Sequence, residues 1–120
     1  MRFACLLLAS ALICLAAAAS GRPAGAFEIR SYITGEKLYK VCASDRDSCY
    51  TYIYGVLDTV MLDDDANKQC TFDPEGVAGD KAVNAVTSYL KEHQDRWDSS
   101  AAALVQNTVR SKFPCKKKKE

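Results

Sequence analysis

The chain has 120 residues, of which 48% are hydrophobic and 26% charged, with a formal net charge of +1, six cysteines and one histidine. This length allows one small domain and excludes a multi-domain protein. With a single histidine, the chain has few side chains suited to acid–base catalysis at neutral pH.

Residues 1–26 are predicted to be a cleaved export signal. A positive start is followed by an apolar stretch at residues 3–19, then by helix-breaking and small residues that suit a signal peptidase. Cleavage is expected between Ala26 and Phe27, with a site near Ala19 as the second choice. At about 17 residues, the apolar stretch is short for a retained membrane anchor.

The mature chain, residues 27–120, contains fourteen basic and fifteen acidic residues. The excess of basic over acidic residues lies in the tail at residues 116–120, where four consecutive lysines precede a glutamate; residues 27–115 contain ten basic and fourteen acidic residues. Such a run can bind nucleic acid or an anionic membrane, but no aromatic residues are interleaved with it. We interpret the tail as a solvated, disordered terminus of an acidic domain that spans residues 27–115.

The mature domain is predicted to begin with a short arm and a short helix. Residues 27–33 alternate between apolar and polar side chains, which predicts an extended arm lying on the helices. Thr34 can cap the helix that follows, and Glu36 suits its first turn. The inward face of this helix is expected to contain Leu38, Val41 and Cys42.

The second helix has the strongest pattern and follows a polar connection predicted at residues 43–48. Its apolar residues recur at helical spacing and form one stripe. The members of the stripe are Tyr50, Ile53, Tyr54, Leu57, Val60 and Met61. Gly55 lies in the middle of this helix, where we expect a close crossing by a neighbouring helix to compensate for its cost of about 1 kcal/mol. Asp63, Asp64 and Asp65 are predicted to end the helix.

Two further helices complete the domain, and both are preceded by turns. Residues 70–79 form a loop, after which Asp80 can cap a third helix; Asp98 or Ser99 can cap a fourth helix, which Pro114 stops. The inward face of the third helix is predicted to contain Ala82, Val83, Val86, Tyr89, Leu90 and His93. The inward face of the fourth is predicted to contain Ala101, Leu104, Val105, Thr108, Val109 and Phe113. The pattern therefore predicts an all-α, small antiparallel four-helix domain.

The cysteines predict two disulfides. Signal cleavage leaves four of them in an oxidising compartment, and four cysteines allow three pairings. In an up-down bundle, Cys42 and Cys49 flank the first connection and lie at the same end. The fourth helix returns to the end at which Cys70 follows the second helix. We therefore predict the pairs Cys42–Cys49 and Cys70–Cys115.

The residues that usually carry chemistry favour no catalytic, cofactor or metal site. His93 is the only histidine, and the cysteine spacing lacks the close pairs typical of zinc sites. Paired cysteines supply no free thiolate for nucleophilic catalysis. Asp63, Asp64 and Asp65 are adjacent in a helix and point in three directions, so a calcium site is disfavoured. We expect a binding protein rather than an enzyme.

Several short motifs in this chain resemble a known family. They are the Gly35-x-x-Leu38 start, the run from Cys49 through Tyr52-Ile53-Tyr54-Gly55-Val56-Leu57-Asp58, and the closing Phe113-Pro114-Cys115. Together they are similar to the Rap/Tai family of immunity proteins. The resemblance implies an exported protein that binds and occludes a peptidoglycan amidase toxin of a type VI secretion system in the bacterial periplasm.

The resemblance also implies a protein-binding surface, for which two places are candidates. The first contains His93, Arg96 and Trp97, because tryptophan and arginine are frequent anchors of tight interfaces. In the alternative interpretation, Trp97 closes the hydrophobic core at the turn. The second place is the acidic group Asp63, Asp64 and Asp65.

A second functional class is a small periplasmic chaperone activated by acid stress, which resembles this chain in size, compartment and helicity. Neither functional class involves binding to nucleic acid or stable insertion into a membrane after signal cleavage. The oligomeric state stays open between a monomer and a homodimer.

Overall fold

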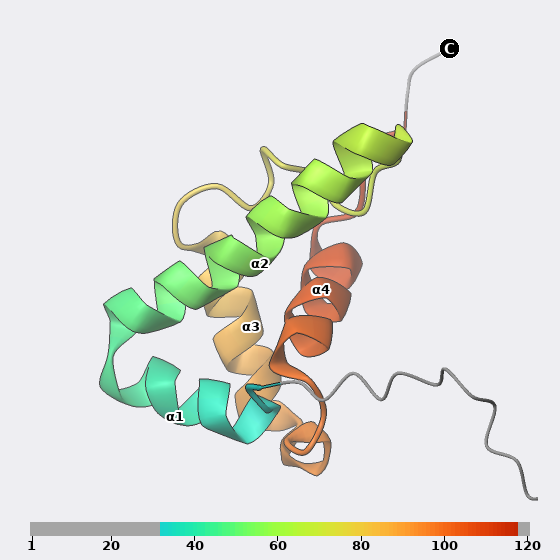
Figure 1. Cartoon of the computed structure of the whole chain (residues 1–120). Coiled ribbons are helices and arrows are strands. Elements are labelled where there is room, and N and C mark those ends of the chain that lie inside the picture. The colour runs from blue at the N-terminus through green and yellow to red at the C-terminus, as the bar shows by residue number, and fades with distance from the viewer. Residues whose placement is uncertain (1–31, 118–120) are drawn as a thin grey trace, which may run out of the picture.

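The computed structural model describes residues 32–117, and all the regular elements in this range are helices. They are α1 (Gly35–Ser44), α2 (Arg46–Asn67), α3 (Lys81–Glu92), a short 3-10 helix η1 (Gln94–Arg96) and α4 (Ala101–Lys112) (Figure 1). The predicted all-α class with four helices is confirmed. The predicted signal at residues 1–26 and most of the predicted arm lie outside the described residues.

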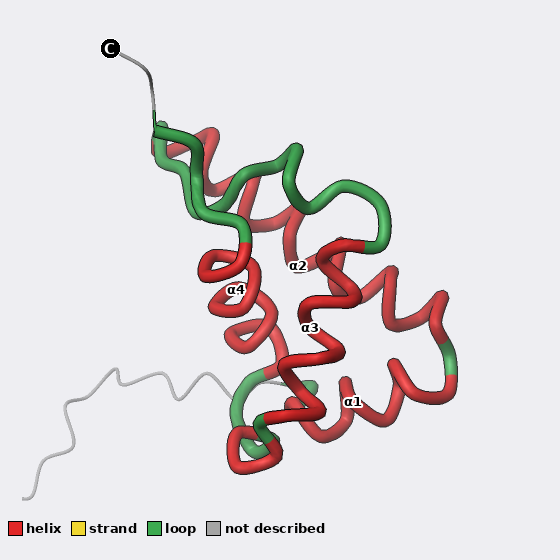
Figure 2. Tube along the Cα trace, turned by 180° about the vertical axis from the view of Figure 1, so that it is seen from behind, coloured by secondary structure: helices red, strands yellow, loops and turns green. Residues whose placement is uncertain are grey.

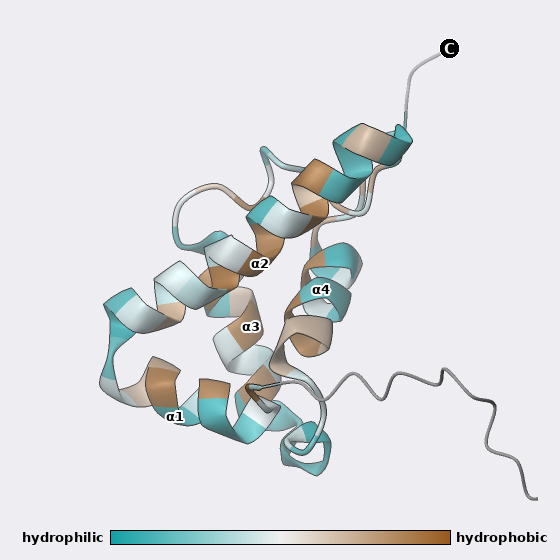
Figure 3. Ribbon diagram, in the orientation of Figure 1, coloured by the Kyte–Doolittle hydropathy of each residue, from teal (hydrophilic) through white to brown (hydrophobic). Residues whose placement is uncertain are grey.

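The four α-helices enclose one hydrophobic core. Helix α2 is the longest, α3 and α4 pack side by side against it, and α1 contacts all three (Figures 1 and 2). Hydrophobic segments gather where the helices face one another (Figure 3). The predicted inward faces of α3 and α4 are largely confirmed, with Tyr89, His93 and Phe113 only partly buried at their edges. None of the helices in the described range is long and apolar enough to cross a membrane.

A sharp bend at Asp45 separates α1 from α2. Asp45 has an extended backbone (φ −143°), and its carboxylate accepts hydrogen bonds of 3.1 Å from the backbone N–H groups of Asp47 and Ser48. The predicted polar connection at residues 43–48 is therefore wrong in extent, since both helices run into it. One residue suffices because Asp45 ends the first helix and caps the second.

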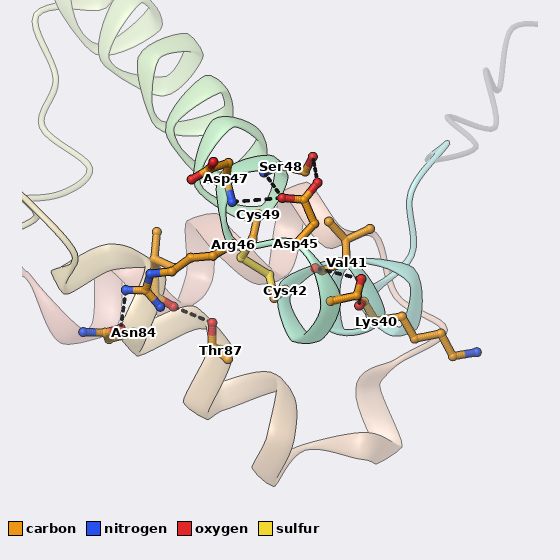
Figure 4. The surroundings of a disulfide bond; sticks show 12 residues. Lys40, Val41, Cys42, Asp45, Arg46, Asp47, Ser48, Cys49, Asn84 and Thr87 are labelled. Carbon is orange, nitrogen blue, oxygen red and sulfur yellow. Dashed lines mark hydrogen bonds between the residues drawn. A yellow bond between two sulfur atoms is a disulfide. The ribbon is translucent and has the colours of Figure 1, made fainter.

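The disulfide between Cys42 and Cys49 spans this bend, as predicted (Figure 4). The Cα atoms of the two cysteines are 4.7 Å apart. On the other side of the bend, Arg46 reaches across to α3, where its guanidinium lies 3.3 Å from the Asp80 carboxylate and 3.5 Å from Asn84 Oδ1. The disulfide thus ties α1 to α2 at the bend, and the polar cluster ties the start of α2 to the start of α3.

The second predicted disulfide, Cys70–Cys115, is also confirmed and joins the loop after α2 to the chain after α4. Helix α2 continues beyond Asp63, Asp64 and Asp65, so the prediction that these residues end it is wrong. The helix ends instead at Lys68, whose left-handed backbone (φ 53°) brings its N–H to the carbonyls of Asp64 and Asp65.

The closely packed glycine of this fold is Gly35 rather than Gly55. A Cβ atom at Gly55 would have no heavy atom within 4 Å, so the predicted close helix crossing there is wrong. A Cβ at Gly35 would lie 2.6 Å from Leu104 Cδ1 and 3.3 Å from Trp97 Cα. The chain packs tightly where α1 begins, and the outer face of α2 around Gly55 is open.

The start of α4 is displaced from its predicted position because α1 is attached there. Ser100 is the N-cap and accepts from Ala103 N–H, whereas Asp98 and Ser99 had been predicted as caps. Ser99 instead accepts a 2.9 Å hydrogen bond from the backbone N–H of Gly35. At α3, Asp80 occupies the predicted cap position, but its side chain makes no capping hydrogen bond.

The apolar stripe of α2 is buried along its centre and exposed at one edge. Ile53, Leu57 and Val60 are at most 6% exposed, whereas Tyr50 and Met61 are 39% and 41% exposed. Tyr50 stacks on Tyr54, whose hydroxyl lies within hydrogen-bonding distance of the carbonyl oxygens of Val77 and Gly79. The stripe therefore also holds the loop that leads into α3.

Candidate partner-binding surfaces

The bend between α1 and α2 forms a groove of about 480 Å³. The disulfide at the bend fixes the two walls relative to each other, so the groove exists before any partner arrives. Most of its lining is apolar. The lining residues are Ile33, Leu38, Val41, Asp47, Ser48, Thr51 and Tyr52.

Asp47 is the one charged residue among those that line the groove. Burial raises the pKa of Tyr52, because it disfavours the charged phenolate. Hydrogen bonds from Ser48 lower the pKa of Asp45, which lies two residues before Asp47 in the chain.

The predicted site residues His93, Arg96 and Trp97 lie together at the corner between α3 and α4. His93 is the C-cap of α3; its ring stacks on Tyr89 with centroids 4.0 Å apart, and its Nδ1 lies 2.9 Å from the Tyr89 carbonyl oxygen. Trp97 Nε1 donates a 2.8 Å hydrogen bond to the Leu90 carbonyl.

Of these three residues, Arg96 is exposed, whereas His93 and Trp97 are partly buried. Trp97 is partly buried, and its ring centroid lies 4.9 Å from that of Tyr39 on α1. This packing agrees with the alternative in which Trp97 closes the core at the turn. Arg96 makes no ion pair with any described residue. The corner thus presents the unpaired guanidinium of Arg96 beside the packed rings of Trp97 and Tyr39.

The predicted acidic group divides into one structural residue and two exposed ones. The Asp64 carboxylate accepts hydrogen bonds from the backbone N–H and the hydroxyl of Thr71, at 2.7 and 2.8 Å. Asp63 accepts from Asn67, and Asp65 is exposed. The side chains do not converge, and the described residues contain no cluster of three or more potential metal ligands.

Sequence reasoning missed the groove between α1 and α2, because no motif marks it. Asp47, Thr51 and Tyr52 appear in the sequence as an ordinary polar connection and helix edge. The groove depends on the angle set at Asp45, which only the three-dimensional structure gives.

A family model for Rap1a immunity proteins matches residues 34–115. The chain belongs to the Rap1a immunity protein family. The matched range contains all the helices of residues 32–117 and both disulfides, and it agrees with the resemblance drawn from the cysteine and glycine motifs. No curated protein and no solved structure gives a significant match.

Membership of this family gives the coarse function of the chain. A Rap1a immunity protein binds a protein effector, and proteins of this family are typically exported and generally non-enzymatic. The surfaces described above, namely the groove, the Arg96 corner and the exposed aspartates, are candidates for contact with such an effector.

Proposed function

We propose that this protein is exported to the periplasm, where it binds a peptidoglycan amidase effector of a type VI secretion system and occludes its catalytic cleft. The observation that carries this proposal is the family match over residues 34–115. The predicted signal sequence and the paired cysteines support export to an oxidising compartment.

The architecture suits inhibition by occlusion. Two disulfides and a one-residue link between α1 and α2 hold the described fold in one conformation. A rigid inhibitor loses little conformational entropy on binding, so more of its contact energy contributes to affinity. Occlusion also needs no catalytic group on the inhibitor.

We propose the corner of His93, Arg96 and Trp97 as the first contact surface, and Asp63 and Asp65 as the second. Arg96 is exposed and has no ion-pair partner among the described residues, so it can pair with a carboxylate of the effector. In this arrangement Trp97 positions the short 3-10 helix that presents Arg96.

The direct test mixes the mature protein, residues 27–120, with peptidoglycan amidase effectors of type VI secretion systems. We expect a stable complex on gel filtration and stoichiometric loss of cleavage of purified peptidoglycan. If the protein binds no cell-wall amidase, but prevents aggregation of unrelated proteins at acidic pH, the chaperone alternative holds instead.

Substitution of Arg96 tests the contact surface. Arg96→Glu should weaken the complex by at least tenfold, whereas Lys37→Glu, an exposed change on α1, should leave it intact. If Arg96→Glu bound the amidase as tightly as Lys37→Glu, the corner would not be part of the interface.

A further inference from the structure

One face near the end of α2 combines exposed apolar and acidic side chains. It consists of Asp58, Met61, Leu62 and Asp65, whose spacing of i, i+3, i+4 and i+7 makes them neighbours on one side of the helix. All four residues are exposed. This surface, the α2 end face, lies at the end of the domain away from α1 (Figures 1 and 2).

The centre of the α2 end face is apolar. Leu62 is 73% exposed and Met61 is 41% exposed, and neither belongs to the hydrophobic core or packs against it. Tyr50, the other exposed large hydrophobic residue of α2, differs because its ring stacks on Tyr54. Leu62 therefore has no packing role in the described fold, and its burial against a partner would gain free energy that folding leaves unused.

Two carboxylates flank this apolar centre. Asp58 lies one turn before Leu62, and Asp65 lies one turn after it. Neither carboxylate forms an ion pair with a residue of the described range. Asp64, by contrast, holds the following loop through its bonds to Thr71. The charges of Asp58 and Asp65 are thus available to a partner.

The position of Asp65 is unfavourable for the free protein. Asp65 lies in the last turn of α2, where the unpaired carbonyl groups of the helix carry partial negative charge and a carboxylate is destabilising. This turn contains no basic residue. The nearest base is the C-cap Lys68, which forms no ion pair within the described range. A cation supplied by a partner would relieve this repulsion.

We infer that the α2 end face docks on the effector at a surface where lysine or arginine side chains surround an apolar hollow. Leu62 fills the hollow, and Asp58 and Asp65 pair with the surrounding cations. The inference rests on the proposed function, in which the effector is the amidase, and it adds an apolar anchor to the second contact surface.

Charge argues against two other occupants of this face. If a second copy packed through the same face about a two-fold axis, with the helices antiparallel, Asp58 of each copy would approach Asp65 of the other, and like charges would repel. An anionic membrane surface would be repelled by the same carboxylates. A cationic protein surface is the occupant that the face complements.

The substitution Leu62→Ser tests the apolar anchor. It should weaken the complex with the amidase by about tenfold, because the buried side chain is lost from the centre of the contact. The melting temperature of the free protein should stay unchanged, since Leu62 is not packed in the described fold. Tyr32→Ser, the matched control, removes a side chain that is 99% exposed outside this face and should leave the affinity unchanged.

The same neutralisation at the two ends of α2 tests the charges. Asp65→Asn should raise the melting temperature of the free protein by about 2 °C, because it removes a carboxylate from the helix C-terminus. It should also weaken the complex by about fivefold at low salt, and by less at high salt. Asp47→Asn, in the first turn of α2, makes the same change in net charge; it should lower the melting temperature and leave the affinity unchanged.

Three results would overturn the inference. If Leu62→Ser and Asp65→Asn both bind the amidase as tightly as the unchanged protein, the face is not part of the interface, although the proposed function stands. If Asp47→Asn and Asp65→Asn weaken the complex equally, only net charge matters. If sedimentation shows a dimer of the free protein that Leu62→Ser abolishes, a second copy occupies the face.

A small probe tests the face when no amidase binds and the proposed function has failed. Titration with the peptide N-acetyl-Lys-Leu-Lys amide should shift the backbone NMR signals of Leu62 and Asp65, and N-acetyl-Glu-Leu-Glu amide should not. In that case selective shifts by the lysine peptide would support a cationic partner of another kind, and the absence of shifts would overturn the docking face as well.

Discussion

Gly35, the first residue of α1, is packed directly against Leu104 of α4. A Cβ on the glycine would lie 2.6 Å from Leu104 Cδ1, and Leu104 is only 2% exposed. The contact attaches the start of α1 to the hydrophobic core. Hydrogen bonds from the N–H groups of Gly35 and Glu36 to Ser99 and Trp97 reinforce it.

The two helical glycines are expected to respond in opposite directions to the same substitution. Gly35→Ala should destabilise the fold by about 1–3 kcal/mol, because Leu104 cannot move freely within a packed core. Gly55→Ala should stabilise it by about 0.5–1 kcal/mol, because alanine is the better helix former and the site is open. Urea unfolding followed by circular dichroism measures both. Stabilisation by Gly35→Ala would contradict the close packing at α1.

The two disulfides should contribute unequally to stability. The Cys70–Cys115 bond closes a loop with a sequence separation of 45, whereas Cys42–Cys49 closes one of only 7. On the chain-entropy account, replacing each pair by serine should cost about 4 kcal/mol for the long loop and about 2.5 kcal/mol for the short one. Chemical unfolding of the two double-serine variants under oxidising conditions measures the order. A larger loss from Cys42–Cys49 would show that its main role is to hold the helix bend.

Asp45 should make the stability of the domain depend on acid pH. Hydrogen bonds from Ser48 and Asp47 lower the pKa of this carboxyl in the folded state. Its stabilisation is therefore fully present above the ordinary carboxyl pKa, and it is lost as pH falls below about 4, through the lowered value. Asn keeps the cap without the charge, so Asp45→Asn should melt near the unchanged protein at pH 7 and lose less stability on acidification. If the melting temperatures of Asp45→Asn and the unchanged protein fell equally on acidification, this role of Asp45 would be refuted.

The Trp97 indole should matter through its hydrogen bond as well as its ring. Trp97→Phe retains an aromatic side chain near Tyr39 but removes the donor to the Leu90 carbonyl. We expect a loss of about 1–2 kcal/mol in the free energy of unfolding. Leu62→Ser, at a side chain that is 73% exposed, serves as a control and should change stability by less than about 0.5 kcal/mol. If Trp97→Phe left the free energy of unfolding unchanged, the hydrogen bond to Leu90 would not be needed at the corner.

Helix periodicity and cysteine number were sufficient to predict the fold class and the disulfide pairing. The stripes of α3 and α4 repeat at helical spacing because each helix buries one face, and this requirement is already present in the order of residues. The pairs Cys42–Cys49 and Cys70–Cys115 follow from which ends of successive helices meet. These are local or topological properties, and neighbouring side chains do not alter them.

The roles of residues that depend on contacts between distant segments could not be predicted from periodicity or cysteine number. Gly35 and Gly55 look alike in sequence, and only the approach of Leu104 distinguishes them. In the same way, Thr108 is predicted as a core residue, while its missing hydrogen bond and its place beside Lys112 depend on how α3 packs on α4. The sequence alone determined which faces are buried; the tertiary structure decided which groups meet across them, because that depends on the angles and distances between helices.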